Sequence, residues 1–274
     1  MMRWIGSLPK YLFILLIVLI NLFPFFIIAL NSFRNYEEIR LKPIGLGPLS
    51  LNNYVKAEQT AHLLRALLNG IVISFASILL IIPTSAMLSY AVTKMPFRIN
   101  KIVYGYIAVG YLVPAASILI NMYLVLKFLH LLNTYWGIIL VYGAIYISIA
   151  VITISGFMKS IPNELIESAK IDGANHFRIL WRIVFPLCQP IIATMVILLF
   201  LWTFREFIWP QILLKGTVAQ RPIAVALASF VGERFIDYGQ MSAAVVISVV
   251  PIMIVFIFMK DKIISGLSAG ALKA

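Results

Sequence analysis

Six apolar runs constrain the fold of this chain more than any other feature of its sequence. None of them contains Asp, Glu, Lys or Arg, and they cover residues 11–30, 71–93, 102–126, 136–158, 187–204 and 241–259. A helix of about 20 apolar residues is long enough to cross the hydrocarbon core of a bilayer. We therefore expect an all-α integral membrane protein with six transmembrane helices, built as one transmembrane domain over residues 1–274.

The composition excludes an ordinary soluble protein and argues against a nucleic-acid partner. Only 12% of the residues are charged and 62% are hydrophobic, whereas soluble domains carry about 25% charged residues. The net charge of +12 does not form one basic stripe, because Lys and Arg lie in short loops beside the apolar runs. That distribution is typical of membrane topology, so we expect a lipid bilayer and no nucleic acid.

The loops also predict an orientation. Six spans place both termini on the same side, and that side has the more basic short loops, such as 94–101 with three bases and no acid. Basic loops stay in the cytoplasm, which places both termini and the polar insert 160–186 there. The first run has no small-x-small cleavage site after it, so we expect a retained span rather than a signal peptide. The long segments 31–70 and 203–240 then form partly ordered caps on the outer side.

No motif in the sequence predicts a catalytic, nucleotide-binding or metal-binding site. The sequence has no phosphate-binding G-x-x-x-x-G-K-[ST] loop, no H-E-x-x-H and no Cys/His cluster. The three histidines are scattered, and the single Cys188 lies in an apolar context that suits packing. We therefore expect no catalytic residue, no metal site and no cofactor on this chain. Spans without ionisable residues also argue against an ion-coupled carrier, so the energy for any transport must come from a partner.

The insert between the fourth and fifth runs predicts two short helices joined by a glycine. The first should begin near Pro162 with Ser160 as its cap and with Glu164 at the positive end of the helix dipole. Leu165 and Ala169, four residues apart, should form its apolar ridge. Such a helix of about 11 residues is roughly 16 Å long, too short to cross a membrane. A protein groove suits its acidic face better than the anionic inner leaflet does.

Gly173 is expected to end the first helix in the left-handed conformation, and Asn175 to cap the second helix. Pro186 and Pro190 should stop the second helix and start the fifth span. Its apolar face should consist of Phe177, Leu180, Trp181 and Val184. For this second helix a position in the lipid interface remains an alternative to a protein partner.

These residues carry a family resemblance. Glu167-Ser168-Ala169, three residues, Gly173, nine residues and then Ile183-Val184-Phe185-Pro186 resemble the EAA motif of permease subunits in bacterial ABC importers. The middle Ala is replaced by Ser168 and the Leu by Phe185. The longer run IPNELIESAKIDGA is similar to the carbohydrate branch, in particular to the smaller of the two maltose-type permease subunits. Residues 202–207 (WTFREF) depart from the Trp-Asn-Glu-Phe often found there in that branch.

The resemblance implies a permease subunit that moves a sugar inward by alternating access in the bacterial plasma membrane. ATP and Mg would be bound, and ATP hydrolysed, on two separate ATPase subunits, so this chain would not be an enzyme. A second homologous permease subunit and an extracytoplasmic sugar-binding protein would complete the importer. Coupling to the ATPase would involve Glu164, Glu167, Ser168, Ala169, Asp172, Gly173, Ile183 and Pro186. The alternatives are another branch of ABC importers and, with less support, an ion-coupled secondary carrier.

A substrate pathway has only a weak signal in the sequence. Aromatic rings stack on the faces of sugar rings, but they also serve as packing residues and as interfacial belts in membrane proteins. The candidates for sugar contact are Tyr111, Tyr123 and Trp202.

Overall fold

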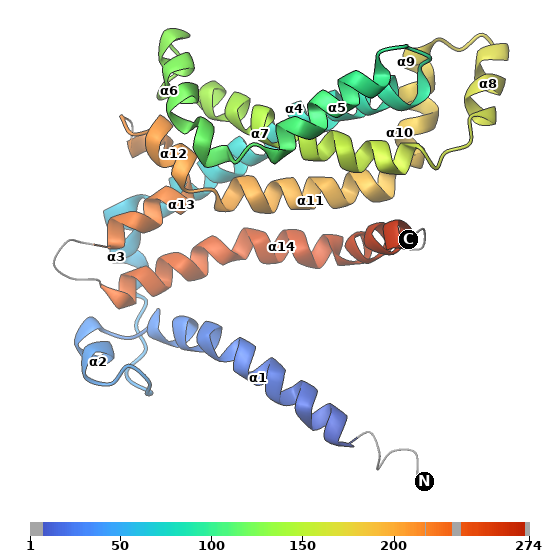
Figure 1. Ribbon diagram of the computed structural model, residues 1–274. Coiled ribbons are helices and arrows are strands. Elements are labelled where there is room, and N and C mark those ends of the chain that lie inside the picture. Colours follow the sequence, from blue (N-terminus) through green and yellow to red (C-terminus); the bar gives the residue numbers. More distant parts are fainter. Residues whose placement is uncertain (1–7, 217, 232–236, 272–274) are drawn as a thin grey trace. The chain divides into compact units, whose positions relative to one another are not determined.

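The computed structural model describes residues 8–216, 218–231 and 237–271, and every element of regular structure in these ranges is a helix (Figure 1). The prediction of an all-helical chain is confirmed. The elements are α1 (Leu8–Asn31), α2 (Tyr36–Leu41), α3 (Asn52–Ala61), α4 (Leu63–Lys94), α5 (Asn100–Leu112), η2 (Ala115–Ile118), α6 (Leu119–Phe128), α7 (Tyr135–Met158), α8 (Glu164–Ile171), α9 (His176–Ile179), the π-helical η3 (Leu180–Val184), α10 (Phe185–Leu187), α11 (Gln189–Arg205), α12 (Ile208–Leu213), η4 (Val218–Gln220), α13 (Ile223–Ala226), η5 (Leu227–Phe230) and α14 (Tyr238–Ala271).

Four stretches of single helix are long and apolar enough to cross a membrane. They are Lys10–Asn31, Leu63–Lys94, Tyr135–Met158 and Tyr238–Phe258. Two further candidates are bent pairs, in which Asn100–Leu112 meets Ala115–Phe128 at 91° and His176–Leu187 meets Gln189–Arg205 at 79°. The described residues thus offer four spans, or up to six if each bent pair crosses once.

The third apolar run is not the continuous helix that its composition predicts. α5 ends at Leu112, and the chain is extended at Val113 and Pro114 before η2 begins at Ala115. Proline has no N–H for the helical hydrogen bond and disfavours the helical conformation of the residue before it. Pro83, in contrast, lies inside the unbroken α4.

The chain divides into two compact units. The larger comprises residues 66–225 and 251–274, and its central helix is α7, against which α5, α11 and α12 pack. The buried side chains of Ile73, Ile138 and Trp209 belong to the same core cluster. Figure 1 shows α8 and α9 beyond the ends of α5 and α7, which places the insert at one end of this unit.

The smaller unit comprises residues 1–65, described from residue 8, and 226–250. Buried Asn53 donates two hydrogen bonds from Nδ2, to the carbonyl oxygens of Ser32 (3.0 Å) and Arg34 (2.7 Å). The Arg34 guanidinium, 2% exposed, donates to the Lys42 carbonyl oxygen at 2.8 Å. Gly239 lies close to Asn53, because a Cβ at Gly239 would be 2.7 Å from Asn53 Nδ2. Buried polar groups held by several hydrogen bonds give this segment an ordered structure.

Candidate functional site

The turn between α8 and α9 has the geometry that the sequence predicts. Gly173 has a φ of +79°, in the left-handed region. Its N–H donates to the Lys170 carbonyl oxygen at 3.0 Å, and the Ala174 N–H donates to the Ala169 carbonyl oxygen at 2.9 Å. This pair of hydrogen bonds is the Schellman motif, which satisfies the last carbonyls of a helix. The predicted role of Gly173 in ending the first helix is confirmed.

The start of α8 differs from the sequence prediction. The N-cap is Asn163, and the helix has 8 residues, so it is about 12 Å long. Pro162 lies before the helix, and the Ser160 hydroxyl donates to the Phe157 carbonyl oxygen at 2.8 Å. Ser160 is therefore not the cap, because its hydroxyl is used in the turn that follows α7.

The buried side of α8 also differs from the predicted ridge. Ile166 and Ala169 are 3% and 7% exposed, whereas Leu165 is 44% exposed. The prediction is confirmed for Ala169 and wrong for Leu165. Ile166, three residues before Ala169, takes the buried position instead of Leu165. The exposed residues of α8 and its turn include three carboxylates, beside exposed Leu165, Lys170 and Ile171. We call Glu164, Glu167, Ser168 and Asp172 the acidic face.

Within the described part of the chain, no salt bridge involves the acidic face. The single ion pair in the described residues joins Arg40 to Glu37, far from the insert in sequence. None of Glu164, Glu167 and Asp172 is in such an ion pair, although Lys94 and Lys170 lie near this side of the helix. Exposed carboxylates outside salt bridges are able to bind a basic partner surface.

The second helix of the insert begins as predicted and continues further than predicted. The Arg178 N–H donates to Asn175 Oδ1 at 2.9 Å, which confirms Asn175 as its cap. The helix does not stop at Pro186, and the 79° bend comes at Cys188. Because proline lacks an N–H, an α-helical bond to the carbonyl four residues earlier is impossible, and the chain is π-helical over η3 before Pro186. Ile183 lies within η3.

The predicted apolar face of this helix is only partly buried. Leu180 and Val184 are 3% and 0% exposed, whereas Phe177 is 67% exposed. Phe177 and Trp181 have ring centroids 6.1 Å apart, and Trp181 and Phe185 are 4.8 Å apart, so the aromatic residues form a ladder of their own. The π-helical turn has wider i→i+5 hydrogen bonding than an α-helix. The aromatic side chains Phe177, Trp181 and Phe185 lie on a side of the helix different from that of buried Leu180 and Val184.

Sequence reasoning missed the contacts that hold the insert to α4. Lys94 Nζ donates to the Ile161 carbonyl oxygen at 2.6 Å and to Asn163 Oδ1 at 2.9 Å. The Tyr90 hydroxyl and His176 Nδ1 are 3.0 Å apart. Sequence separations of 67 to 86 residues leave no local pattern from which these pairs could have been found.

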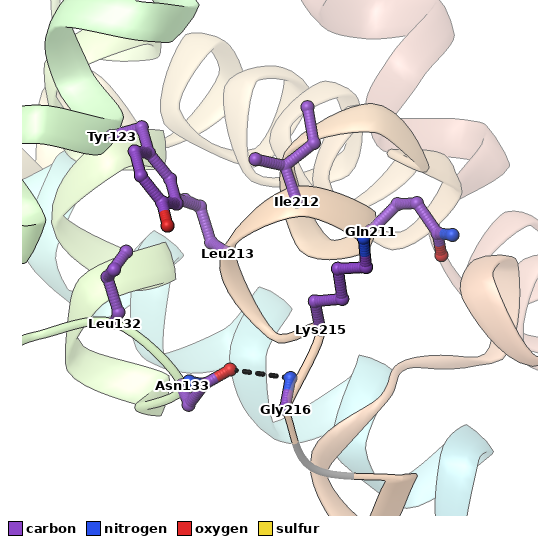
Figure 2. A pocket seen from close by; sticks show the side chains of 8 residues that line it. All are labelled: Tyr123, Leu132, Asn133, Gln211, Ile212, Leu213, Lys215 and Gly216. Carbon is purple, nitrogen blue, oxygen red and sulfur yellow. Dashed lines mark hydrogen bonds between the residues drawn. The ribbon is translucent and has the colours of Figure 1, made fainter.

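The three aromatic candidates for sugar contact fall into two cavities. Tyr111 and Trp202 line one of about 430 Å³ beside the break at Pro114, and Tyr146 lines it with them. The Tyr146 and Trp202 rings are stacked, with centroids 5.6 Å apart and planes inclined by 24°. Tyr123 lines a second cavity, of about 540 Å³, with Asn133 and other residues between α6 and α12 (Figure 2).

Two residues that line the second cavity, Asn133 and Gly216, join distant segments by a hydrogen bond. Asn133 Oδ1 accepts from the Gly216 N–H at 2.8 Å (Figure 2). The Asn133 N–H donates to the Leu213 carbonyl oxygen at 2.8 Å. Gln211 and Lys215 line the same cavity. Within the described residues, no three His, Cys, Asp or Glu side chains are grouped to hold a metal ion.

Comparisons with known proteins agree with this architecture. Residues 81–267 match the family model described as the binding-protein-dependent transport system inner membrane component. The probable starch degradation products transport system permease protein AmyC of Thermoanaerobacterium thermosulfurigenes is 30% identical, over 96% of this chain and 97% of the relative. The melibiose/raffinose/stachyose import permease protein MelC of Bacillus subtilis is 29% identical, over 91% of each chain.

A solved structure shares the fold. It is a chain of a bacterial ABC transporter involved in the import of the acidic polysaccharide alginate, with a TM-score of 0.82 and 21% identity. The superposition covers 94% of this chain and 96% of that chain. The family match spans well over half of the sequence and includes α7, the insert and α11. The chain belongs to the family of inner membrane components of binding-protein-dependent transport systems.

Proposed function

We propose that this chain is a permease subunit of an ABC importer that carries an oligosaccharide or a related sugar into a bacterial cell. Family membership supports the permease role, and the names of relatives matched over nearly their full lengths support the sugar. The observation that carries the coupling role is the Schellman turn at Gly173, which holds the acidic face of α8 outward. ATP and Mg then belong to two partner ATPase subunits.

The six-span topology is part of this proposal. Each bent pair of helices then crosses the membrane once, and residues 1–274 make up one permease domain with both termini in the cytoplasm. The insert follows α7 on the cytoplasmic side, which is where a soluble ATPase is accessible. A second homologous permease subunit completes the pore, and a sugar-binding protein delivers the substrate from outside.

In the proposed mechanism, α8 docks into a groove of the ATPase. Four residues of the acidic face contact the partner, namely Glu164, Glu167, Ser168 and Asp172. The buried Ala169 side chain and the left-handed turn at exposed Gly173 keep α8 in place. Ile183 and Pro186 join this element to α11 through the π-helical turn and the bend at Cys188. ATP binding favours one arrangement of the docked helices, and this differential affinity shifts the membrane helices between inward-facing and outward-facing states.

The cavity beside Pro114 is the better candidate for the sugar pathway. A broken helix leaves backbone carbonyls without intrahelical partners, and in a membrane such groups are tolerated where they line a cavity. Tyr111, Tyr146 and Trp202 add aromatic faces on which a sugar ring can stack. The cavity with Tyr123 would be a second contact on the same path, with polar groups from Asn133 and Gln211.

Reconstitution with the partner subunits tests the proposal. Glu167→Lys reverses the charge at an exposed position of the acidic face, and we expect the importer to lose its ATPase on purification and its sugar uptake into liposomes. Glu37→Lys is the control, because Glu37 is also an exposed carboxylate and its ion pair with Arg40 is a weak surface pair. Retention of the ATPase by Glu167→Lys at the wild-type level would contradict the docking role of the acidic face.

A further inference from the structure

Helix α4 holds the insert on both sides of Gly173. Lys94, its last residue, bonds to Ile161 and Asn163 just before α8 at 2.6 and 2.9 Å. Tyr90, four residues earlier and therefore on the same helix face, lies 3.0 Å from Nδ1 of His176 at the start of α9. The Tyr90 and His176 rings also meet edge to face, with centroids 5.9 Å apart. α4 is distant from the insert in sequence, yet it forms hydrogen bonds at the start of both helices of the insert.

The bond between Lys94 and Asn163 replaces a helix cap. Asparagine is among the preferred N-cap residues because its side-chain oxygen accepts a backbone N–H of the first turn. Asn163 occupies the N-cap of α8, but its side chain makes no capping bond and accepts from Lys94 instead. Glu164 adds a favourable charge interaction with the Lys94 ammonium. The polar groups at the start of α8 are therefore directed to α4 rather than to α8 itself.

α4 is in turn tied to the centre of the larger unit. The Ser89 hydroxyl, next to Tyr90 in sequence, donates to the Val151 carbonyl oxygen of α7 at 3.2 Å, and both groups are buried. The Tyr90 side chain is 3% exposed, so its bond to His176 is formed at the edge of the packed interior. A displacement of α8 or α9 therefore reaches α4 through directional polar bonds as well as through packing.

We propose that Lys94 and Tyr90 are positioning residues that transmit the movement of the docked insert to α4. This inference rests on the proposed function. It adds a route by which a conformational change of the ATPase subunits reaches the membrane helices. α8 has 8 residues and buries the side chains of Ile166 and Ala169, a small apolar contact that permits slippage. Charge-assisted hydrogen bonds have defined geometry and resist such slippage.

The transmission role differs measurably from a purely structural one. If Lys94 only maintains the shape of the insert, its loss weakens ATPase binding and hydrolysis together with transport. If Lys94 transmits movement, the ATPase still binds and hydrolyses ATP, and fewer sugar molecules are imported for each ATP. The ratio of sugar imported to ATP hydrolysed therefore separates the two roles.

The experiment uses the complete importer in liposomes, with its partner permease, ATPase subunits and sugar-loaded binding protein. Lys94→Met removes both charge-assisted bonds, and we expect sugar imported per ATP to fall about tenfold at an unchanged ATPase content. Lys94→Arg retains charge and donors and should restore most of this ratio, while Tyr90→Phe should lower it about threefold. Lys101→Met is the matched control, because Lys101 is an exposed residue of α5 in the same basic loop region.

Each outcome has a distinct meaning. An unchanged ratio in Lys94→Met, in an importer whose wild type transports sugar, overturns the transmission role alone. Loss of the ATPase from Lys94→Met, or failure of Lys94→Arg to restore the ratio, also overturns it, because the residue is then needed for shape. A wild-type complex that holds no ATPase refutes the proposed function, and the role of α4 falls with it.

Discussion

Replacement of Gly173 by alanine gives the sharpest test of how the insert keeps its shape. An added Cβ would meet no atom within 4 Å, so Gly173→Ala creates no steric clash with the rest of the chain. The cost comes from the backbone, because φ is +79° and an L-residue in the left-handed region loses about 1–2 kcal/mol. The turn therefore opens more often, and the Schellman hydrogen bonds that direct α8 outward break more often.

This conformational free energy predicts how much the affinity of the permease for the ATPase falls. If the ATPase recognises only the closed turn, the apparent dissociation constant rises in proportion to the loss of the competent fraction. A penalty of about 1–2 kcal/mol corresponds to an increase of up to about 5- to 30-fold. Titration of labelled ATPase subunit onto the permease pair in nanodiscs measures this change directly.

Two further variants test whether the loss of binding comes from the left-handed backbone conformation at Gly173. Gly156→Ala in α7 also places its Cβ in open space, but at a helical position, where alanine favours the helix by about 1 kcal/mol and binding should not change. Gly173→Asn should bind better than Gly173→Ala, because Asn tolerates the left-handed conformation. The reasoning is refuted if Gly173→Ala binds the ATPase as tightly as wild type, or if Gly173→Asn is the worse of the two.

Further predictions concern the buried interior and the cavity beside Pro114. The Tyr142 hydroxyl is buried and has no hydrogen-bond partner in the described residues, so Tyr142→Phe should raise thermal stability, by about 1 kcal/mol in a melting experiment on the purified permease. Tyr135→Phe should lower it by about the same amount, because the Tyr135 hydroxyl donates to Asn69 Oδ1 at 2.7 Å; equal melting temperatures for both variants would contradict this difference. Trp202→Ala should raise the sugar concentration for half-maximal uptake about tenfold and Trp202→Phe much less, since phenylalanine retains a face for stacking; equal uptake by both variants would place the sugar elsewhere.

Features set by neighbouring residues were predictable from the sequence. The left-handed turn at Gly173 and the cap at Asn175 depend on backbone preferences that act within a few residues, and both have the expected hydrogen bonds. The six apolar runs predicted where helices lie, yet α14 continues as a helix to Ala271, beyond the expected end at residue 259. Apolar composition marks the part of a helix that suits lipid, and a helix continues through polar residues where nothing breaks it.

Features set by tertiary contacts were not predictable. The phase of α8 depends on what packs beneath it, and a choice between Leu165 and Ile166 as the buried residue has no local signal. Both Pro83 and Pro114 lie within apolar runs, yet the helix continues through Pro83 and breaks at Pro114. Neighbouring helices decide in each case whether the freed carbonyl of a proline is satisfied.

The motif combines the buried residue Ala169 with exposed residues such as Glu167 and Ser168. Ala169 faces the chain itself, and Gly173 defines the turn, so these two positions specify the shape of the docking element. Exposed positions such as Glu164, Leu165 and Asp172 remain to contact the ATPase. Specificity is a difference in affinity between partners, and it arises from the residues that touch them. Under the proposed function, Ala169 and Gly173 therefore fix the shape of the docking element, and the exposed residues of α8, including Glu167 and Ser168 of the motif, select which ATPase this permease accepts.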